Sequence, residues 1–286
     1  MSMPNLNGLK SRINVIKNTE KITNAMELVS TSKLRRLRNE FLSISSYQAT
    51  LQNILNDLIN NIEPRKLYSI FPKNTTKGKL YIVLTSDLGL CGSYNYNIFN
   101  LLKEKIQPHD QIIIIGNKGI ALFKNSKLKD QVIKTIANVG DSLSYEFSSS
   151  IIKIALDLYS ENKICAINLL YTEFINNLTQ EAKLFQLFPF VLDKEKVGTK
   201  ISQLIEFEPN AETVLVKSVP LFLTSALYNH AFSSKISEIA SRRNAMENAT
   251  NNAGDLIQNL QLEYNRQRQS LITQEITEIV SGADAT

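Results

Sequence analysis

Apolar residues recur at intervals of three and four over the C-terminal quarter of the chain, residues 211–286. Before residue 282 this segment has one proline, Pro220, and one glycine, Gly254. Because an apolar stripe of near-heptad spacing needs a partner, the pattern predicts one long helix packed against another. Pro220 removes a backbone donor, so we expect it to bend this helix or to separate a short segment from it. The stripe comprises Ala253, Ile257, Leu260, Tyr264 and Leu271 and then, after a one-residue shift, Ile272, Ile276, Ile279 and Ala283.

The N-terminal end carries a second stripe of the same kind. Residues 4–62 contain no proline after Pro4 and no glycine after Gly8. This pattern predicts a helix of roughly 55 residues. Two such helices at the ends of the chain predict an antiparallel or wrapped pair, with the residues between them forming an insertion. The stripe includes Leu34, Leu37, Phe41, Ile44, Leu51, Leu55, Leu58 and Ile62.

The insertion, residues 63–210, has short apolar runs instead of long stripes. Continuous runs such as LYIVLTSD predict strands that are buried on both faces. Strands that alternate with helices predict a Rossmann-like α/β domain with a mostly parallel sheet. We expect strands at residues 80–87, 111–116, 131–137 and 163–174, an edge partner at 181–190, and helices at 93–106, 118–123 and 141–160.

Composition limits the class of protein. The chain has 286 residues, is 43% hydrophobic and has no run of 18 uncharged apolar residues, so we expect no transmembrane helix. Its two cysteines, Cys91 and Cys165, lack metal-ligand spacing and fit a reducing compartment. Residues 1–40 carry eight Lys or Arg against three Glu. Such a basic helix is most simply solvated, but it also suits an acidic protein, anionic lipid or nucleic acid.

One local motif suggests chemistry, the segment SDLGLCGSYN at residues 86–95. It follows the first predicted strand, where α/β folds place ligands, and its glycines would let a backbone approach a phosphate. It is neither a GxGxxG fingerprint nor a Walker loop, so a tight strand-to-helix turn is the simpler interpretation. Cys91 would need a base to act as a nucleophile, and neither His109 nor His230 can be placed near it. We therefore predict no catalytic, cofactor or metal site.

Three segments together resemble the gamma subunit of the F-type ATP synthases. They are LKSRINVIKNTEKITNAMELVSTSKLRR at residues 9–36, SDLGLCGSYN at 86–95, and YNRQRQSLITQEITEIVSGADA at 264–285. The last is the most specific, and the resemblance covers essentially the whole chain. In the second segment Leu88 stands where the family usually has Arg, which puts any contact by that side chain in doubt. The lack of a presequence favours a bacterial member.

The resemblance implies a rotor with no nucleotide site and no enzymatic activity of its own. Family members have a long antiparallel coiled coil, formed by the N- and C-terminal helices, inside a ring of three alpha and three beta subunits. Their central α/β domain sits on the membrane c-ring beside the epsilon subunit. One copy per complex couples proton flow to ATP synthesis or hydrolysis. We therefore expect a peripheral protein at the cytoplasmic face of the bacterial inner membrane, with helices at 1–62 and 211–286 and an α/β domain at 63–210, and no nucleic-acid partner.

The resemblance also implies particular contacts. The basic N-terminal helix would face acidic loops of the beta subunits. Without the resemblance, Met26 would simply pack between helices, and Arg242 would form a solvated pair with Arg243. The contacts with alpha and beta correspond to Met26, Arg242, Gln269 and Thr273, and those with the c-ring to Phe207 and Glu208.

Two other functions remain open on the sequence. One is an α/β enzyme that acts at the turn between Gly89 and Gly92. The other is a coiled-coil scaffold or tether that binds membrane or nucleic acid through its basic helix. Copurification with alpha and beta subunits in a fixed ratio would separate a rotor from both.

Overall fold

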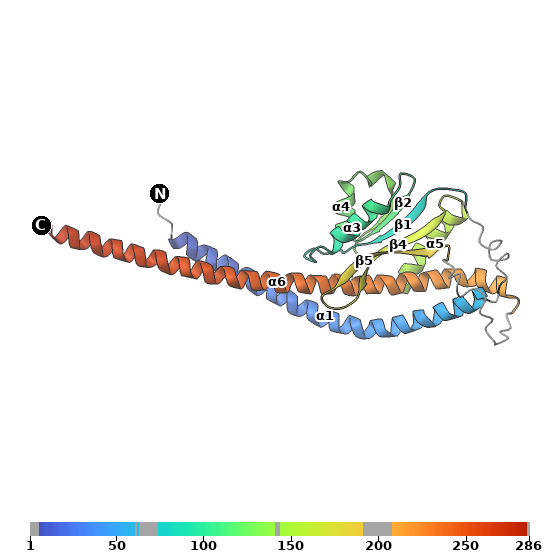
Figure 1. Ribbon diagram of the computed structural model, residues 1–286, viewed down its shortest axis with the longest axis horizontal. Helices are drawn as coiled ribbons and strands as arrows, with labels where there is room; N and C mark the ends of the chain where they lie inside the picture. Colours follow the sequence, from blue (N-terminus) through green and yellow to red (C-terminus); the bar gives the residue numbers. More distant parts are fainter. Residues whose placement is uncertain (1–5, 61, 63–73, 141–143, 191–207, 285–286) are drawn as a thin grey trace. The chain divides into compact units, whose positions relative to one another are not determined.

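Two long helices, α1 (Leu6–Asn60) and α6 (Ala211–Asp284), lie at the two ends of the chain (Figure 1). The computed structural model describes residues 6–60, 62, 74–140, 144–190 and 208–284. It divides into two compact units, one formed by Met1–Ser32 with Arg242–Thr286 and the other by Lys33–Ser241. Both helices therefore contribute residues to both units. The predicted fold class, long terminal helices with a central α/β domain, is confirmed.

The unit Lys33–Ser241 contains a five-stranded sheet of order β3-β2-β1-β4-β5. The first four strands are parallel, and β5 pairs antiparallel with β4 at the edge, as the sequence predicted. The strands are β1 (Lys79–Leu84), β2 (Gln111–Ile115), β3 (Val132–Ile136), β4 (Ala166–Phe174) and β5 (Gln180–Phe188). The connecting helices are α3 (Tyr94–Lys105), α4 (Asn117–Lys124), the short 3-10 helix η1 (Lys129–Gln131) and α5 (Tyr145–Ser160).

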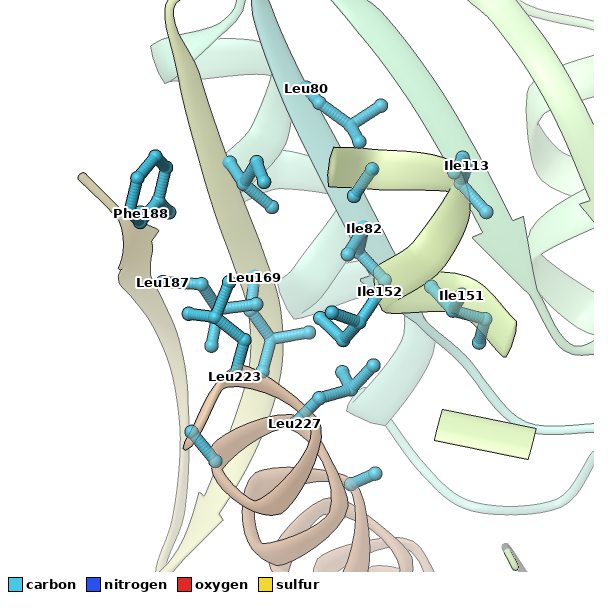
Figure 2. Packing of buried hydrophobic residues seen from close by; sticks show 14 of the residues in the cluster. Leu80, Ile82, Ile113, Ile151, Ile152, Leu169, Leu187, Phe188, Leu223 and Leu227 are labelled. Carbon is cyan, nitrogen blue, oxygen red and sulfur yellow. The ribbon is translucent and has the colours of Figure 1, made fainter. Parts of the chain in front are cut away.

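The central strands are buried on both faces because each face has its own helical cover. One face packs against α3 and α4, with Tyr81, Val83, Ile112 and Ile114 buried beneath them. The opposite face packs against α5 and against α6 itself (Figure 2). Burying one Leu or Ile side chain contributes about 1.5–3 kcal/mol, so these two layers account for much of the stability. The second face includes Ile82, Ile113 and Leu169 from the sheet, Ile151 and Ile152 from α5, and Leu223 and Leu227 from α6.

Within the unit Lys33–Ser241, α1 and α6 form the predicted antiparallel pair. Leu34 and Leu37 share a cluster with Ile236 and Ile239, and the later α1 residues share one with earlier α6 residues. The Phe41 and Phe232 rings stack with centroids 6.2 Å apart. Residue numbers increase along α1 while those of the contacting α6 residues decrease, so the two helices are antiparallel. The second cluster contains Leu51, Leu55 and Leu58 with Leu215 and Phe222.

The same pairing is present in the other unit, where Thr250 Oγ1 donates to Thr23 Oγ1 at 2.8 Å. The last buried side chain of α6 is Leu260, and none of the described side chains after it is buried. In an antiparallel pair with Thr23 beside Thr250, Leu6 at the start of α1 lies near Gln267, because each is 17 residues from that contact. The rest of α6 therefore continues past the start of α1. The prediction of a partner for the final part of the stripe is therefore wrong for the described residues. Ile272, Ile276 and Ile279 are 46%, 56% and 71% exposed.

Of the two expectations for Pro220, a bend or a separated segment, the separated segment is wrong, because α6 runs unbroken from Ala211 to Asp284 with the proline inside it. Pro220 and Val216, whose carbonyl loses its helical donor, both face solvent, Val216 with 50% exposure. Water can hydrate that carbonyl, which lowers the cost of the missing bond. Buried neighbours on the opposite side hold the segment in place, Leu215 in the cluster with α1 and Val219 in the core of the sheet.

Gly116, at the end of β2, is a position where a side chain is not tolerated. Its φ is +106°, and a Cβ there would lie 2.3 Å from the carbonyl oxygen of Thr85. Gly140 also has a positive φ, +74°, but a Cβ there would meet nothing within 4 Å. A side chain at either glycine would strain the backbone, but only a side chain at Gly116 would also overlap a neighbouring atom.

We predict that Gly116→Ala destabilises the chain by about 3 kcal/mol or more, because overpacking adds to left-handed strain. The matched control Gly140→Ala should cost only about 1–2 kcal/mol, from strain alone. Urea unfolding of the purified chain measures both. Equal losses of unfolding free energy would show that the close approach to Thr85 does not constrain this loop.

Candidate functional site

The loop after β1, which contains the SDLGLCGSYN motif, connects three strand ends. The Asp87 carboxylate accepts hydrogen bonds from the backbone N–H groups of Asn117 at 3.0 Å, Asn138 at 3.1 Å and Gly140 at 3.0 Å. These donors follow β2 and β3, so one side chain joins the carboxyl ends of β1, β2 and β3. Three backbone donors on one carboxylate indicate that Asp87 has a structural role.

Cys91 lies inside the same loop and is 2% exposed. Asn95 Nδ2 donates to the Cys91 Sγ at 3.3 Å and to Ser86 Oγ at 2.8 Å, and Asn95 Oδ1 accepts from Ser86 N–H at 2.9 Å. No imidazole contacts the thiol among the described residues. His230 lies instead between the rings of Tyr171 and Phe185, each centroid 4.5 Å away. Cys91 is thus a packed thiol in a tight turn.

Residues of α6 line the crevice where an open α/β sheet binds ligands. With the order β3-β2-β1-β4-β5, the chain reverses direction between β1 and β4, and ligands bind outside that point. At this place the described residues enclose a cavity of about 30 Å³, lined by Thr85, Asp87 and Tyr94 together with Ser234, Lys235 and Glu238 from α6. Ligand pockets are about 300–1,000 Å³, so this space suits water but not a nucleotide.

The cavity wall includes a buried ion pair, in which Lys235 Nζ lies 3.2 Å from Glu238 Oε2 with side chains 11% and 5% exposed. A paired charge is far less costly to bury than a single one. The pair lets α6 present charged residues toward the sheet without breaking the packing around them. This pair could not be predicted from the sequence, because i,i+3 charge pairs are common on solvated helix faces.

Four serines of α6 also form contacts that the sequence analysis missed. Ser233, Ser234, Ser237 and Ser241 each hydrogen-bond to backbone groups of β4 or of the loop after β1. Their signal was present as hydroxyls at helical spacing on an otherwise apolar face. Periodicity alone does not tell such a face from a solvent-exposed one.

The comparisons with known proteins agree across the chain. A family model described as ATP synthase matches residues 5–286. The ATP synthase gamma chain of Mycoplasmopsis synoviae (strain 53) is 48% identical over 288 residues, which cover 99% of this chain and 100% of that protein. The chain belongs to the ATP synthase gamma-chain family. The gamma chain of Mycoplasmopsis pulmonis (strain UAB CTIP) is 42% identical over 98% of this chain and 99% of that one.

Solved structures from mitochondrial ATP synthases share the fold. The Euglena gracilis mitochondrial ATP synthase rotor, solved by electron cryo-microscopy, matches with a TM-score of 0.70 and 20% identity over 93% of this chain and 98% of that one. The central stalk and c-ring structure of the Tetrahymena thermophila mitochondrial ATP synthase matches with a TM-score of 0.60 and 25% identity over 80% of this chain and 99% of that one. None of the described helices of this gamma chain has an apolar stretch long enough to cross a membrane.

The residues that the gamma-chain resemblance singled out differ in their surroundings. Gln269 and Thr273 are exposed one turn apart on α6, and Thr273 Oγ1 donates to the Gln269 carbonyl at 2.9 Å. Met26 is half-buried. Arg242 is buried, with 9% exposure, whereas Arg243 pairs with Glu247 at 3.1 Å, so the simpler expectation of a solvated arginine pair does not hold.

The two residues expected at the c-ring lie just before α6. Glu208 is exposed, two residues before Asn210, whose side chain accepts from the Thr213 N–H at 2.8 Å and so caps the start of the helix. Phe207 lies outside the described residues.

His230 provides a pH-dependent contribution to stability. Burial lowers its pKa to about 4, against a smaller raising effect from Glu173. An unfolded histidine titrates near ~6.5, so between these values the unfolded chain binds a proton that the folded chain does not. The stabilisation is therefore complete above pH ~6.5 and is lost as the pH falls toward 4.

We predict that His230→Phe removes this dependence, because the ring stays between Tyr171 and Phe185 but no longer titrates. The fall in unfolding free energy between pH 6.5 and 4 should be smaller in the variant by up to about 3 kcal/mol. Chemical denaturation across that range measures the difference between the two proteins. If both lose stability in parallel, His230 is not protected from protonation.

Proposed function

We propose that this gamma chain is the central-stalk rotor of a proton-translocating ATP synthase. A single copy turns inside three alpha and three beta subunits and couples proton flow through the c-ring to ATP synthesis or hydrolysis. The chain acts as a component of the enzyme, and nucleotides bind to the alpha and beta subunits. The complex holds it peripherally at the cytoplasmic face of the bacterial inner membrane, beside the epsilon subunit.

The observation that carries this proposal is the uncovered C-terminal part of α6. Beyond Leu260 the helix continues to Asp284 with no buried side chain among the described residues, and its apolar stripe faces outward. Exposed apolar surface of this extent marks a protein interface. A single rigid helix with an apolar stripe fits a passage lined by other subunits, as the gamma-chain family implies.

The other two functions lack comparable support. An enzyme at the turn between Gly89 and Gly92 would need a ligand space that the roughly 30 Å³ cavity does not provide. A tether would use the basic face of α1, where Arg35 and Arg36 are exposed. In the rotor, the same two arginines attract acidic loops of the beta subunits, so the basic face does not favour a tether.

The rotor must transmit more energy than one contact can hold. One charge moved through 100 mV supplies about 2.3 kcal/mol, so a step driven by about three charges carries roughly 7 kcal/mol. An exposed ion pair contributes about 0–1 kcal/mol and a charge-assisted hydrogen bond about 1.5–3 kcal/mol. The grip of the alpha and beta subunits is therefore distributed over several residues, including Met26, Arg242, Gln269 and Thr273.

We predict that Gln269→Ala and Arg242→Ala each weaken ATP-driven proton pumping in membrane vesicles by roughly two- to tenfold, as expected for losing one hydrogen bond. The double variant should pump less than either, and its loss should be non-additive if both residues meet one loop. Gln269 is the cleaner test because it is exposed, whereas Arg242 is buried and its replacement also disturbs packing.

The matched control is Lys129→Ala, since Lys129 is exposed on η1 in the α/β domain. Assembly of each complex is measured beside pumping, so that loss of the subunit is not mistaken for loss of grip. If the single and double variants all pump at the control rate, these contact assignments are wrong.

We also predict that Glu208 lies at the c-ring. A cysteine at position 208 should form a disulfide with a cysteine in the polar loop of the c subunit, because Glu208 is exposed at the boundary before α6. A cysteine at the exposed residue Lys124, at the end of α4, serves as the control. Crosslinking of position 208 to beta alone would show that this end of α6 faces the catalytic subunits.

A further inference from the structure

Serines of α6 form hydrogen bonds at the end of β4, where β4 extends beyond its neighbour β1. β1 pairs with β4 only as far as the match between Val83 and Leu170. β4 continues to Phe174, so beyond Leu170 its edge on the β1 side has backbone groups without a strand partner. Buried backbone groups of this kind need hydrogen-bond partners.

Serine side chains of α6 supply those partners. Thr172 N–H donates to Ser234 Oγ at 3.1 Å, and Ser237 Oγ donates to the Thr172 carbonyl at 3.1 Å, so both backbone groups of Thr172 are satisfied by one helix. Two residues further along β4, Phe174 N–H donates to Ser233 Oγ at 3.1 Å. The helix thus replaces the missing strand with side-chain hydroxyls.

Three more bonds continue this line onto the loop after β1 and the first residue of α3. Ser241 Oγ donates to the Cys91 carbonyl at 2.8 Å. The Tyr94 hydroxyl lies 2.8 Å from Ser234 Oγ and donates to the Ser234 carbonyl at 3.2 Å. The residues Ser233, Ser234 and Ser237 are 4%, 2% and 0% exposed, so water does not compete for their hydroxyls.

We propose that these four serines, the serine seam, transmit torque between the α/β domain and the shaft helix α6. Apolar packing is non-directional, so it resists separation of two surfaces more than it resists small rotation or sliding. A hydrogen bond weakens steeply once its angle or distance is wrong, and a buried group that loses its partner is costly. The seam therefore fixes both the axial position of α6 and its rotation about its own axis.

This proposal rests on the proposed rotor function and specifies how the rotor holds together. Torque from the c-ring enters through the α/β domain and must reach α6 without the helix turning against the sheet. The seam bonds contact backbone at β4 and at the loop after β1, two separate segments of the domain. Two separated anchor points oppose rotation of the helix more effectively than one.

The test uses the complete membrane-bound complex with the four-serine alanine variant S233A/S234A/S237A/S241A. ATP hydrolysis and the steady-state proton gradient in inverted vesicles are measured together, because a weakened joint fails under load. Hydrolysis should stay within about twofold of the parent, whereas the gradient reached per ATP hydrolysed should fall at least about twofold, since each deletion leaves a buried backbone group unpartnered. A purely structural role would lower the amount of assembled complex and leave this ratio unchanged.

Two controls match the chemistry of the substitution. Ser218→Ala deletes a hydroxyl on the same helix that donates to its own Val214 carbonyl at 2.6 Å and not to the domain. Thr172→Val deletes a hydroxyl beside the seam that has no hydrogen-bond partner among the described residues. Both should keep the parental ratio of gradient to hydrolysis.

A second pair of variants covers the case in which the fourfold variant does not assemble. Ser237→Thr and Ser237→Val have similar volumes and differ in the hydroxyl, so the Thr variant should retain coupling that the Val variant loses. Hydrogen exchange at the Thr172 amide should accelerate in Ser234→Ala, which removes its acceptor.

The outcomes separate the two proposals. If the serine variants reach the same gradient per ATP as Ser218→Ala, or if the Thr and Val variants of Ser237 behave alike, the seam carries no torque although the rotor function stands. If the parental complex containing this chain does not pump at all, the rotor function itself fails.

Discussion

The fold depends on the packing of one stretch of α6 across the face of the sheet. Leu223 and Leu227 of α6 share a core with Ile82 and Leu169 of the strands (Figure 2), and a neighbouring α6 residue, Phe222, packs against α1. The helix is therefore a layer of the α/β domain and half of a helix pair at the same time. A change in its position would disturb the sheet core and the α1 pairing together, and this shared packing explains why so long an element has a defined place.

The sequence predicted most of this architecture because burial leaves a clear trace. Runs such as QIIIIG are apolar at every position, and strands buried on both faces require that pattern, so β1, β2 and β4 were placed correctly. The edge strand β5 was also predicted, from its partial alternation. Stripes with spacings of three and four gave both long helices and their antiparallel pairing in the same way.

The sequence could not show which structural element, if any, packs against a given face of α6. The stripe at Ile272, Ile276 and Ile279 looks like the one at Ile257 and Leu260, yet only the second is buried within the chain. Arg242 and Arg243 are adjacent in sequence, but one is buried and the other pairs with Glu247. The serines of α6 were missed for the same reason, because their backbone partners lie at Thr172 and Phe174, far away along the chain. Whether Met26, Gln269 and Thr273 contact other subunits likewise depends on surfaces outside this chain.

The two parts of α6 have opposite surface chemistry, and each suits a different mechanical task. Where the helix must not turn, against the sheet, it uses buried hydroxyls that bond to fixed backbone groups, and such bonds have one favourable angle. Toward the C-terminus, beyond Leu260, it presents the exposed apolar side chains of Ile272, Ile276 and Ile279. Apolar contact has little angular preference, so a surrounding wall can hold this part at many rotational positions with similar free energy. The placement of serines and isoleucines along one continuous element therefore fixes α6 against its own domain and gives its C-terminal part a surface with weak angular preference.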